Sequence, residues 1–538
     1  MTGASDQLFL VGLGGPGGAL SEELAGSKAA QLAQMSELGL PIPPAFVMPT
    51  SLCCGVNRAD EDALCALKSG LRVGIARLEE ATGRRFGDSR APLFVSVRSG
   101  AAKSMPGMLD TILNVGMNGV TVQGAVRLTG NPRLAWDCYR RFVQNYAQVV
   151  GGASGAEFAR ALGATLRAEQ AESEDELDCE ALERLTAQFI NIAAGVCGRR
   201  PPEDPSDQLE TAARAVYASW LGPRAREYRR LNRLEDLLGT AVTVQSMVLG
   251  NSGSRSGAGV AFSRNPGTGE KELYVDFLFD AQGEDVVSGR RTPGDAAMFA
   301  RWLPDAAQEL AVAARRLEQH FKDVQDIEFT VEEGRLYFLQ TRAAKRTPRA
   351  ALRIAVDMAR EGLIAPAEAL RRLEGVNLEQ AGRATLRGLT APLARATPAS
   401  PGVAVGRIAF DGASAKRLSR DGGAAILVRR EPSTEDIAGF DAADGILTIA
   451  GGRTAHAAVV ARQLGKACLV GCRGLEIDQA GHRLTLAGQA FQEGDWLSID
   501  GESGEIFAGR AEVLAERPEA ELAELEVWRE EAAKASGR

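Results

Sequence analysis

The segment GILTIAGGRTAHAAVVARQLG, residues 445–465, joins an apolar run, a Gly-Gly turn and a helical pattern. The run at 445–449 is typical of a short buried strand. From Ala457 onward, apolar residues recur at i, i+3, i+4 and i+7 until Gly465, a common residue just past a helix C-terminus. The sequence therefore predicts a strand, a glycine turn and a helix that has His456 at its N-terminus.

A histidine in that position suits one chemistry in particular. Unpaired backbone N–H groups and the helix dipole stabilise an anion at a helix N-terminus, so a phosphate carried on the imidazole is favoured there, whereas an imidazolium gains nothing. From these residues alone, a histidine that only packs or caps the helix remains an alternative. The other histidines, His320 and His482, are scattered, and the cysteines show no accompanying zinc spacing, so we expect no structural zinc.

Residues 326–342 have the pattern of a β-hairpin with a turn at Glu333-Gly334. The period of two predicts a core face made of Ile327, Phe329, Val331, Tyr337 and Leu339. Four polar side chains share the other face, namely Asp326, Glu328, Gln340 and Arg342. Leu336 and Phe338 fall on that polar face too, so the second strand alternates less cleanly.

A turn of odd length would set Asp326 opposite Gln340. Two carboxylates beside an amide and a guanidinium suit a nucleotide with its magnesium ion. A solvated strand face with cross-strand ion pairs is the alternative for this hairpin.

Two basic residues near the N-terminus are further candidates. Lys28 lies in the first turn of a helix expected over 27–38, where the dipole disfavours a cation unless an anion binds. Arg98 ends a strand expected over 93–98, just before the loop 99–107, whose backbone could wrap phosphates. Each residue taken singly is equally consistent with a solvated base. A second glycine-rich loop, 250–259, could cover a nucleotide.

The length of 538 residues indicates several domains of mixed α/β and α+β class. We expect a nucleotide-binding region over 1–345 with a helical insert at about 131–235, and a helical connector over 346–392. A domain of short strands around one helix follows over 393–512, entered through a Pro- and Ala-rich linker at 393–402. An acidic helix or tail covers 513–538.

The charge balance of 62 basic and 70 acidic residues gives −8, which argues against nucleic-acid and membrane-surface partners. No basic residue precedes Lys28 and no apolar run reaches about 18 residues, so neither a signal peptide nor a spanning helix is expected. Eight sparse cysteines do not indicate a disulfide scaffold. We expect a cytoplasmic protein.

Several segments together resemble the pyruvate, phosphate dikinase family. The resemblance rests on five stretches in the family's order: 40–44, 96–108, 281–287, 326–330 and the His456 motif. It implies an ATP-grasp nucleotide-binding region followed by a swivelling phosphohistidine domain. It also implies that the histidine takes the β,γ-pyrophosphoryl group of ATP, that inorganic phosphate removes the γ group as pyrophosphate, and that phosphohistidine phosphorylates pyruvate. The Ser104–Met108 loop is similar to the dikinase branch rather than the water-using synthase branch.

The resemblance also implies roles for single residues. Lys28, Arg98 and Arg342 would hold phosphates, and His456 would be the phosphocarrier, so that His456 and Arg98 are the catalytic candidates. Three residues would surround ATP and its Mg²⁺, the metal being held by the first two: Asp326, Glu328 and Gln340. Gln245 and Met247 are similar to the segment that lines the adenine pocket.

Three positions near the carrier histidine and the nucleotide differ from the family or bear on its regulation. Ala455 stands where the family usually has Ser or Cys, and Asp276 replaces a usual Glu. Thr454 matches the threonine that regulatory kinases modify in some relatives.

The family continues into a barrel that binds pyruvate and phosphoenolpyruvate, and this sequence shows no counterpart of it. We therefore expect a dikinase-like phosphotransferase that uses ATP, phosphate and magnesium and passes phosphate from His456 to an acceptor domain on another chain. Two alternatives remain open at this point: the same ATP-using half acting on a different acceptor, and a non-catalytic ATP-binding regulatory protein.

Overall fold

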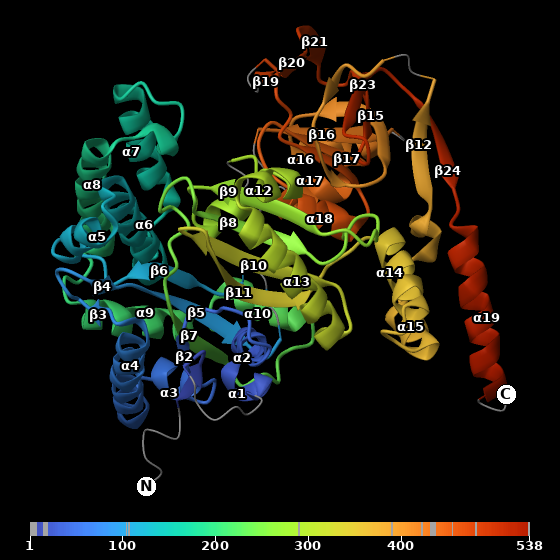
Figure 1. The fold of residues 1–538 in the computed structure, drawn as a ribbon. Coiled ribbons are helices and arrows are strands. Elements are labelled where there is room, and N and C mark those ends of the chain that lie inside the picture. The colour runs from blue at the N-terminus through green and yellow to red at the C-terminus, as the bar shows by residue number, and fades with distance from the viewer. Residues whose placement is uncertain are drawn as a thin grey trace. The chain divides into compact units, whose positions relative to one another are not determined.

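The structure is a computed structural model that describes residues 8–13, 20–103, 105, 108–288, 291–388, 391–420, 423–430, 437–453, 456–478 and 481–535, with backbone alone at 437, 438, 456, 457 and 535. The chain divides into two compact units. The first contains residues 1–252 and 337–340, and the second contains residues 253–336 and 341–538. Figure 1 shows the elements of both units along the chain.

The first unit is built on an antiparallel sheet with the strand order β1-β2-β7-β5-β6. Its strands are β1 (Phe9–Val11), β2 (Ala45–Met48), β5 (Val95–Ala101), β6 (Thr111–Val115) and β7 (Thr240–Ser246). A short parallel pair, β3 (Arg85–Phe86) and β4 (Pro92–Leu93), stands apart. β7 is buried along its whole length, because strands pair with it on both edges and helices cover it.

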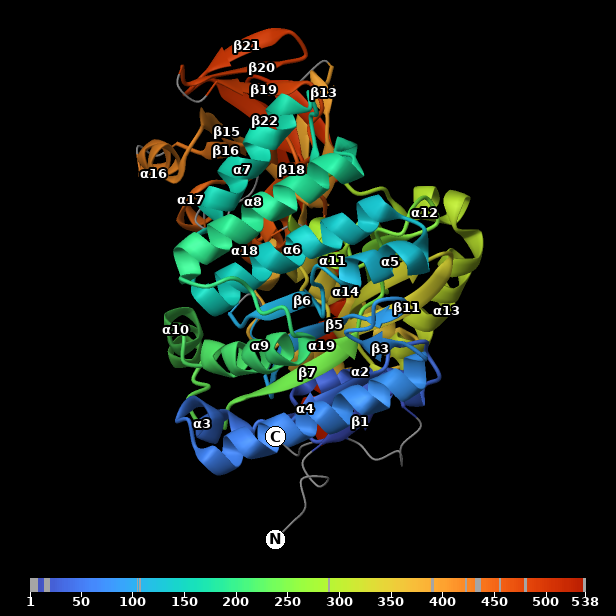
Figure 2. The same cartoon turned by 90° about the vertical axis from the view of Figure 1, so that its left-hand side faces the viewer.

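Helices make up most of the rest of the first unit, as Figure 2 shows. The first four are α1 (Glu22–Ala25), α2 (Ser27–Glu37), α3 (Leu52–Asn57) and α4 (Glu61–Thr82). The others are α5 (Thr121–Thr129), α6 (Pro132–Gly151), α7 (Gly155–Ala168), α8 (Cys179–Cys197), α9 (Pro205–Ser219) and α10 (Pro223–Leu231), with a 3₁₀ turn at Glu174–Glu176. The helices α6 to α10 lie within the range 131–235, for which a helical insert was predicted. Of these, α6 and α9 pack on the sheet and share one core with Phe46 and Met48 of β2.

The second unit begins with a sheet of strand order β11-β10-β8-β9. The strands are β8 (Gly257–Phe262), β9 (Tyr274–Phe279), β10 (Gln325–Glu332) and β11 (Arg335–Ala343), and the helices nearby are α11 (Gly283–Ser288), α12 (Ala296–Trp302) and α13 (Pro304–Phe321). The expected hairpin of β10 and β11 is confirmed, but only two residues separate the strands. The predicted turn of odd length is therefore wrong.

The even turn length accounts for a second difference in the hairpin. On β10 the predicted core residues Ile327, Phe329 and Val331 are fully buried. On β11 the fully buried apolar side chains are Leu336 and Phe338, whereas Tyr337 and Leu339 are half-buried. The core face predicted for the second strand is wrong by one residue, because adding or removing one turn residue exchanges the two faces of a strand.

The rest of the second unit contains an eight-stranded sheet of order β13-β23-β22-β15-β16-β17-β18-β14. The strands are β13 (Ala394–Arg395), β14 (Thr397–Ser400), β15 (Val403–Ala409), β16 (Ala425–Arg429), β17 (Gly445–Thr448), β18 (Ala467–Val470), β22 (Trp496–Asp500) and β23 (Glu505–Ala508). Strands β15 to β18 are parallel, and α16 (Gly412–Arg420), α17 (Ile437–Ala442) and α18 (His456–Leu464) connect them in turn. A small antiparallel sheet contains β19 (Leu475–Asp478), β20 (Arg483–Leu486) and β21 (Gln489–Gln492).

Two expectations for this region are corrected. We expected one helix, but the region has three, because each parallel crossover requires a connecting element. The segment 393–402, expected to be a linker, contains β13 and β14, which pair with β23 and β18. The small side chains of this segment belong to two edge strands of the sheet and not to a flexible linker.

The connector predicted to be helical is only partly so. It contains α14 (Pro348–Arg360), α15 (Pro366–Arg372) and a 3₁₀ turn at Leu378–Ala381, followed by a strand, β12 (Arg383–Arg387). That strand pairs with β24 (Glu512–Glu516). The final helix, α19 (Glu519–Ala535), lies in the segment predicted to be an acidic helix or tail. It packs on α14 and α15 and buries Leu525.

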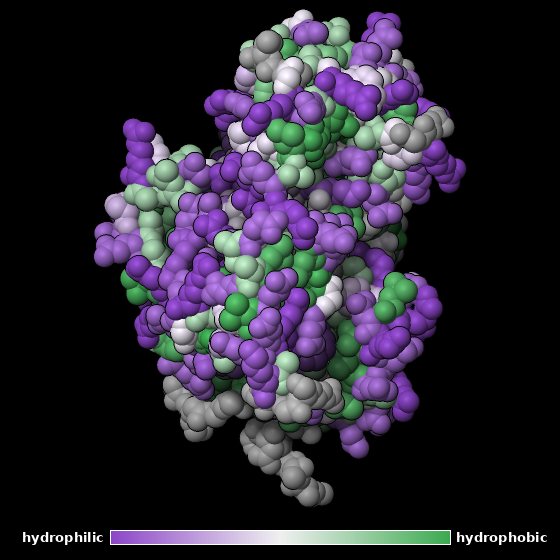
Figure 3. Space-filling view, turned by 90° about the vertical axis from the view of Figure 1, so that its right-hand side faces the viewer, coloured by the Kyte–Doolittle hydropathy of each residue, from purple (hydrophilic) through white to green (hydrophobic). Residues whose placement is uncertain are grey.

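Among the described residues, no helix has the length and apolar character needed to cross a membrane. The face in Figure 3 is mainly hydrophilic, with hydrophobic residues in small separate patches.

Candidate functional site

Arg98 lies on β5, an inner strand of the first unit's sheet that pairs with β7 and β6. Its Nη1 donates to Oε1 of Gln245 on the neighbouring strand β7 at 3.4 Å. The strand does not end at Arg98 as predicted, because Ser99, Gly100 and Ala101 continue the ladder with β7. The N–H of Gly100 also donates to Oγ1 of Thr240 at 3.0 Å, so this part of the expected phosphate loop is paired within the sheet.

Gln245 connects Arg98 to the segment 40–44. Its side chain is 2% exposed, and its Nε2 donates to the carbonyl oxygen of Pro43 at 3.1 Å. A buried amide that is held at both ends presents a fixed surface, which is what a site for a flat heterocycle requires. Met247, two residues further on, is half-buried, and its backbone N–H donates to Phe94 at 2.9 Å.

Lys28 lies in the first turn of α2, as predicted, and is half-buried. The start of this helix is fixed to the end of β5. Oγ of Ser27 donates to the carbonyl oxygen of Ala101 at 3.1 Å, and Gly26 lies so close to the Gly100 carbonyl that a Cβ at residue 26 would clash with it. Gly26 also has a φ of 79°, which favours glycine. The structure thus holds the Lys28 segment against the strand that carries Arg98.

Asp326, Glu328 and Arg342 lie together in the second unit. Nε of Arg342 donates to Oδ2 of Asp326 at 2.8 Å, and its Nη2 lies 4.0 Å from Oε1 of Glu328. Asp326 is 7% exposed, whereas the Glu328 side chain is 29% exposed. Burial raises the pKa of the Asp326 carboxyl, although the Arg342 guanidinium acts in the opposite direction. The predicted grouping of these three side chains is present.

Gln340 is the remaining polar candidate from the hairpin. It is 4% exposed and lies in the short part of β11 that belongs to the first unit. In the same part, the N–H of Phe338 donates to the carbonyl oxygen of Pro41 at 2.8 Å. The segment 40–44 therefore accepts hydrogen bonds from both β7 and β11.

The carboxylates on β10 fit a magnesium ion in one respect. Oδ1 of Asp326 is buried and has no hydrogen-bond partner, so it is an acceptor that a cation could satisfy. No cluster of three or more His, Cys, Asp or Glu side chains suited to a metal occurs in the part of the chain that the structure describes. Magnesium in nucleotide sites is usually held by one or two carboxylates together with substrate phosphates. The two carboxylates of Asp326 and Glu328 are therefore enough for such a site.

His456 is the first residue of α18, which follows β17, as the sequence predicted. The structure describes its backbone only, and Thr454 and Ala455 lie outside the described residues. The helix packs through Ala458 and Ala461, both fully buried, and ends before Gly465 with φ of 65°.

Sequence reasoning missed a contact just before this helix. Nε of Arg453 lies 3.8 Å from Oδ1 of Asp276 on β9, and its guanidinium lies 4.7 Å from the centre of the Tyr274 ring. Asp276 had been noted only as a substitution. No pattern in the sequence pairs residues so far apart, so nothing short of the fold could have revealed this contact.

Two protein-family profiles match segments of this chain. Residues 65–304 and 300–363, together more than half of the chain, match the family profile "Pyruvate phosphate dikinase, AMP/ATP-binding domain". Residues 422–504, which include α18, match "PEP-utilising enzyme, mobile domain".

Individual relatives cover nearly the whole chain. It is 43% identical over 517 residues to a pyruvate, phosphate dikinase of Clostridium symbiosum, which covers 95% of this chain and 59% of that protein. It is 44% identical over 497 residues to pyruvate, phosphate dikinase 1, chloroplastic, of Zea mays, with 91% and 52% covered. A Rhizobium meliloti pyruvate, phosphate dikinase is 42% identical over 530 residues, with 95% and 59% covered. The chain thus spans between half and three fifths of the length of these relatives.

Proposed function

Because the chain belongs to the pyruvate phosphate dikinase family, we propose that it uses ATP and inorganic phosphate to phosphorylate His456. The observation that carries the proposal is the placement of His456 at the start of α18, within the segment that matches the mobile domain. Backbone N–H groups at that end stabilise the negative charge that a phosphorylated imidazole would carry.

The proposed reaction has two balanced steps. An imidazole nitrogen of His456 attacks the β-phosphorus of ATP, the bond between that phosphorus and the α,β-bridging oxygen breaks, and AMP leaves. An oxygen of inorganic phosphate then attacks the γ-phosphorus, and the bond between that phosphorus and the β,γ-bridging oxygen breaks. Pyrophosphate leaves, and the β-phosphate stays on the histidine. Catalysis of such transfers depends on positioning and on cations that offset phosphate charge.

The same proposal assigns binding roles to the candidate side chains. Lys28 and Arg98 contact phosphates, and Gln245 and Met247 line the adenine site. Support comes from the fixed contacts of Arg98 and Gln245 and from the attachment of α2 to β5. In the second unit, Arg342 contacts phosphate.

Asp326 and Glu328 hold Mg²⁺, whose charge offsets that of the phosphates when the ion is bound. The unpartnered Oδ1 of Asp326 supports this role. Gln340 completes the set of ATP-binding residues, and its deep burial is consistent with a preorganised amide.

We extend the proposal to the organisation of the chain. Residues 1–345 form an ATP-grasp nucleotide-binding region, 346–392 a connector, 393–512 a swivelling carrier domain and 513–538 an acidic C-terminal segment that contains α19. Thr454, beside the carrier histidine, remains a predicted site of regulatory phosphorylation outside the described residues.

Replacing Glu328 by glutamine is expected to lower the rate of His456 phosphorylation about a hundredfold, since a neutral amide binds Mg²⁺ poorly and metal-assisted charge stabilisation is worth several kcal/mol. The measurement is transfer of label from β-³²P-ATP to the protein at saturating Mg²⁺. Glu332→Gln makes the same change four residues further along β10 and should label at the wild-type rate. Equal rates in Glu328→Gln and the wild type would remove Glu328 from the active site.

We also propose that the phosphate on His456 passes to a pyruvate-binding acceptor domain on another chain. The segment that contains His456 matches the profile "PEP-utilising enzyme, mobile domain", which supports transfer to an acceptor of that class.

The purified 538-residue chain is therefore expected to exchange labelled AMP into ATP in the presence of phosphate and pyrophosphate, yet to make no phosphoenolpyruvate from pyruvate. The exchange needs only the nucleotide site and His456, whereas the second transfer needs an enclosed site that positions pyruvate. Both are measured on the same preparation. Phosphoenolpyruvate formation at about 10 per second, an ordinary enzyme rate, would show that the acceptor site lies within these residues.

A further inference from the structure

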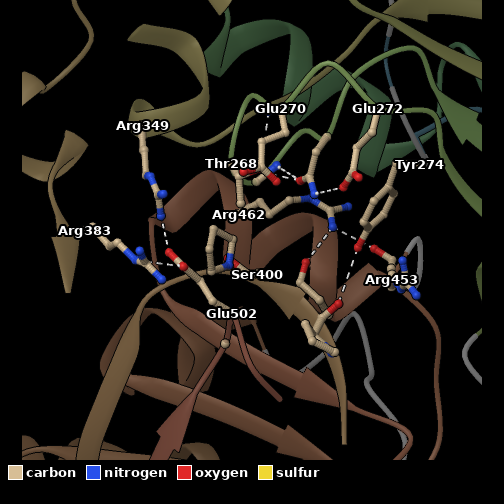
Figure 4. A pocket seen from close by; sticks show the side chains of 16 residues that line it. Thr268, Glu270, Glu272, Tyr274, Arg349, Arg383, Ser400, Arg453, Arg462 and Glu502 are labelled. Atoms are coloured by element: carbon tan, nitrogen blue, oxygen red, sulfur yellow. Dashed lines mark hydrogen bonds and ion pairs between the residues drawn. The ribbon is translucent and has the colours of Figure 1, made fainter. Parts of the chain in front are cut away.

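A cavity of about 360 Å³ lies within the second unit, and none of the residues assigned above to ATP is in its lining. Figure 4 shows the side chains that surround it. Its walls come from the β8–β9 connection, α14, β12, β14 and α18, and from the turn that holds Glu502. This volume is in the range of sites for small ligands. We call it the Arg462 pocket, after the arginine at its centre in Figure 4.

Ser400, at the end of β14, lines this pocket and has an unsatisfied polar group. The residue is 1% exposed, and its Oγ has no hydrogen-bond partner. A buried hydroxyl without a partner costs about 1–3 kcal/mol, so such groups are rare in folded proteins. A ligand atom that accepts a hydrogen bond from Ser400 would remove this cost.

Arg462, on α18, supplies a fixed cation to the same pocket. It is 2% exposed, and its Nη1 donates to the carbonyl oxygens of Ala399 at 2.7 Å and Arg453 at 2.8 Å. Both acceptors are neutral, so these bonds orient the guanidinium without offsetting its charge. Arg453 also lines the pocket and holds its guanidinium over Tyr274. Asp276 lies 3.8 Å from Nε of Arg453 and offsets its charge, so Arg462 is the main source of positive charge at this end.

Two of the three acidic side chains that line the pocket have basic partners, and the third, Glu272, accepts a hydrogen bond from Nδ2 of Asn265 at 3.4 Å. Glu502 forms ion pairs with Arg349 and with Arg383, whose Nε lies 3.1 Å away. Glu270 pairs with Arg353 at 3.3 Å. The lining residues include four arginines and three glutamates, so the lining has a net positive charge, and the complementary ligand group is an anion.

We propose that the Arg462 pocket binds a small molecule through a carboxylate or phosphate group, whose oxygens accept hydrogen bonds from Arg462 and Ser400. Charge-assisted bonds from a guanidinium suit either group. Because α18 carries both Arg462 and His456, a ligand here binds the helix whose first residue is the proposed carrier. The pocket is a second small-molecule site, and its existence does not depend on the proposed reaction.

The test is calorimetric titration of the full chain with four probes at constant ionic strength, against a chloride blank. Sulfate and methyl phosphate represent phosphate groups, and acetate and malonate represent carboxylates. We expect saturable binding either of the two phosphate probes or of the two carboxylate probes. The probes that bind identify the anionic group that the pocket accepts. Ser400→Ala should weaken that binding about tenfold, the effect of one hydrogen bond to a charged group. Arg462→Lys should weaken that binding at least as much, because it removes the planar guanidinium and its fixed set of N–H donors.

Ser498→Ala is the matched control. Ser498 is also a fully buried serine of the eight-stranded sheet, but its Oγ donates to Gly509 at 2.8 Å. This change should lower the melting temperature and leave the probe affinity unchanged, whereas Ser400→Ala should raise the melting temperature, because it removes a buried hydroxyl that has no partner. Absence of binding by all four probes would overturn the proposal. So would equal affinities in Ser400→Ala and the wild type, or equal weakening in the two serine variants.

Discussion

Replacing His456 by asparagine is expected to abolish retention of β-³²P on the protein after incubation with labelled ATP, Mg²⁺ and phosphate. Asparagine keeps a polar side chain at the start of α18 but has no imidazole nitrogen to attack phosphorus. In the wild type we expect an acid-labile label from the β position, while label from the γ position leaves as pyrophosphate. The loss should be complete, because no other group of the site can substitute for the nucleophile.

His482→Asn provides the control for this experiment. His482 is mainly exposed, and its Nδ1 lies 2.8 Å from Oε2 of Glu493, far along the chain from the carrier helix. Its replacement should leave labelling intact. Undiminished label in His456→Asn, or label lost only in His482→Asn, would refute His456 as the carrier.

Replacing Arg264 by methionine is expected to lower the free energy of unfolding of the second unit by about 3–5 kcal/mol, the cost of breaking a buried ion pair. Arg264 follows β8, is fully buried, and lies 2.7 Å from Glu318 on α13 and 2.8 Å from Glu361 after α14. Burial alone would lower the pKa of the guanidinium, but hydrogen bonds to the two glutamates raise it above its ordinary value. Methionine would leave Glu318, 8% exposed at its side chain, without a partner for its charge.

Urea unfolding followed by circular dichroism measures this loss. Arg360→Met is the matched control, because Arg360 pairs with Glu524 while half exposed, and such pairs are worth at most about 1 kcal/mol. Adding Glu318→Gln to Arg264→Met should restore part of the stability by removing the unpaired charge. A loss in Arg264→Met no larger than that in Arg360→Met would contradict the structural role of the network.

Local sequence patterns predicted the elements whose neighbours in the fold are also neighbours in the chain. The helix after the Gly-Gly turn and the β10–β11 hairpin were found because spacing alone distinguishes a period of 3.6 from a period of 2. The face of β11 was predicted wrongly because it depends on turn length, which a single glycine does not fix. β13 and β14 were mistaken for a linker because edge strands are stabilised by partners, β23 and β18, that lie about 70 to 110 residues away.

For the candidate site, too, some features followed from the sequence and others required the folded structure. The sequence by itself determined the residue types and their local settings: His456 at a helix start, Lys28 in a first turn, and Asp326 with Glu328 on one strand. Only the tertiary structure decided which of them have partners, as in the contacts of Arg98 with Gln245 and of Arg342 with Asp326. It alone revealed the Arg462 pocket, where Ser400 and Arg462 meet residues from the 265–274 segment. The physical reason is that periodicity and helix dipoles act within a few residues, whereas burial, ion pairing and an unsatisfied hydroxyl depend on side chains that only folding brings together.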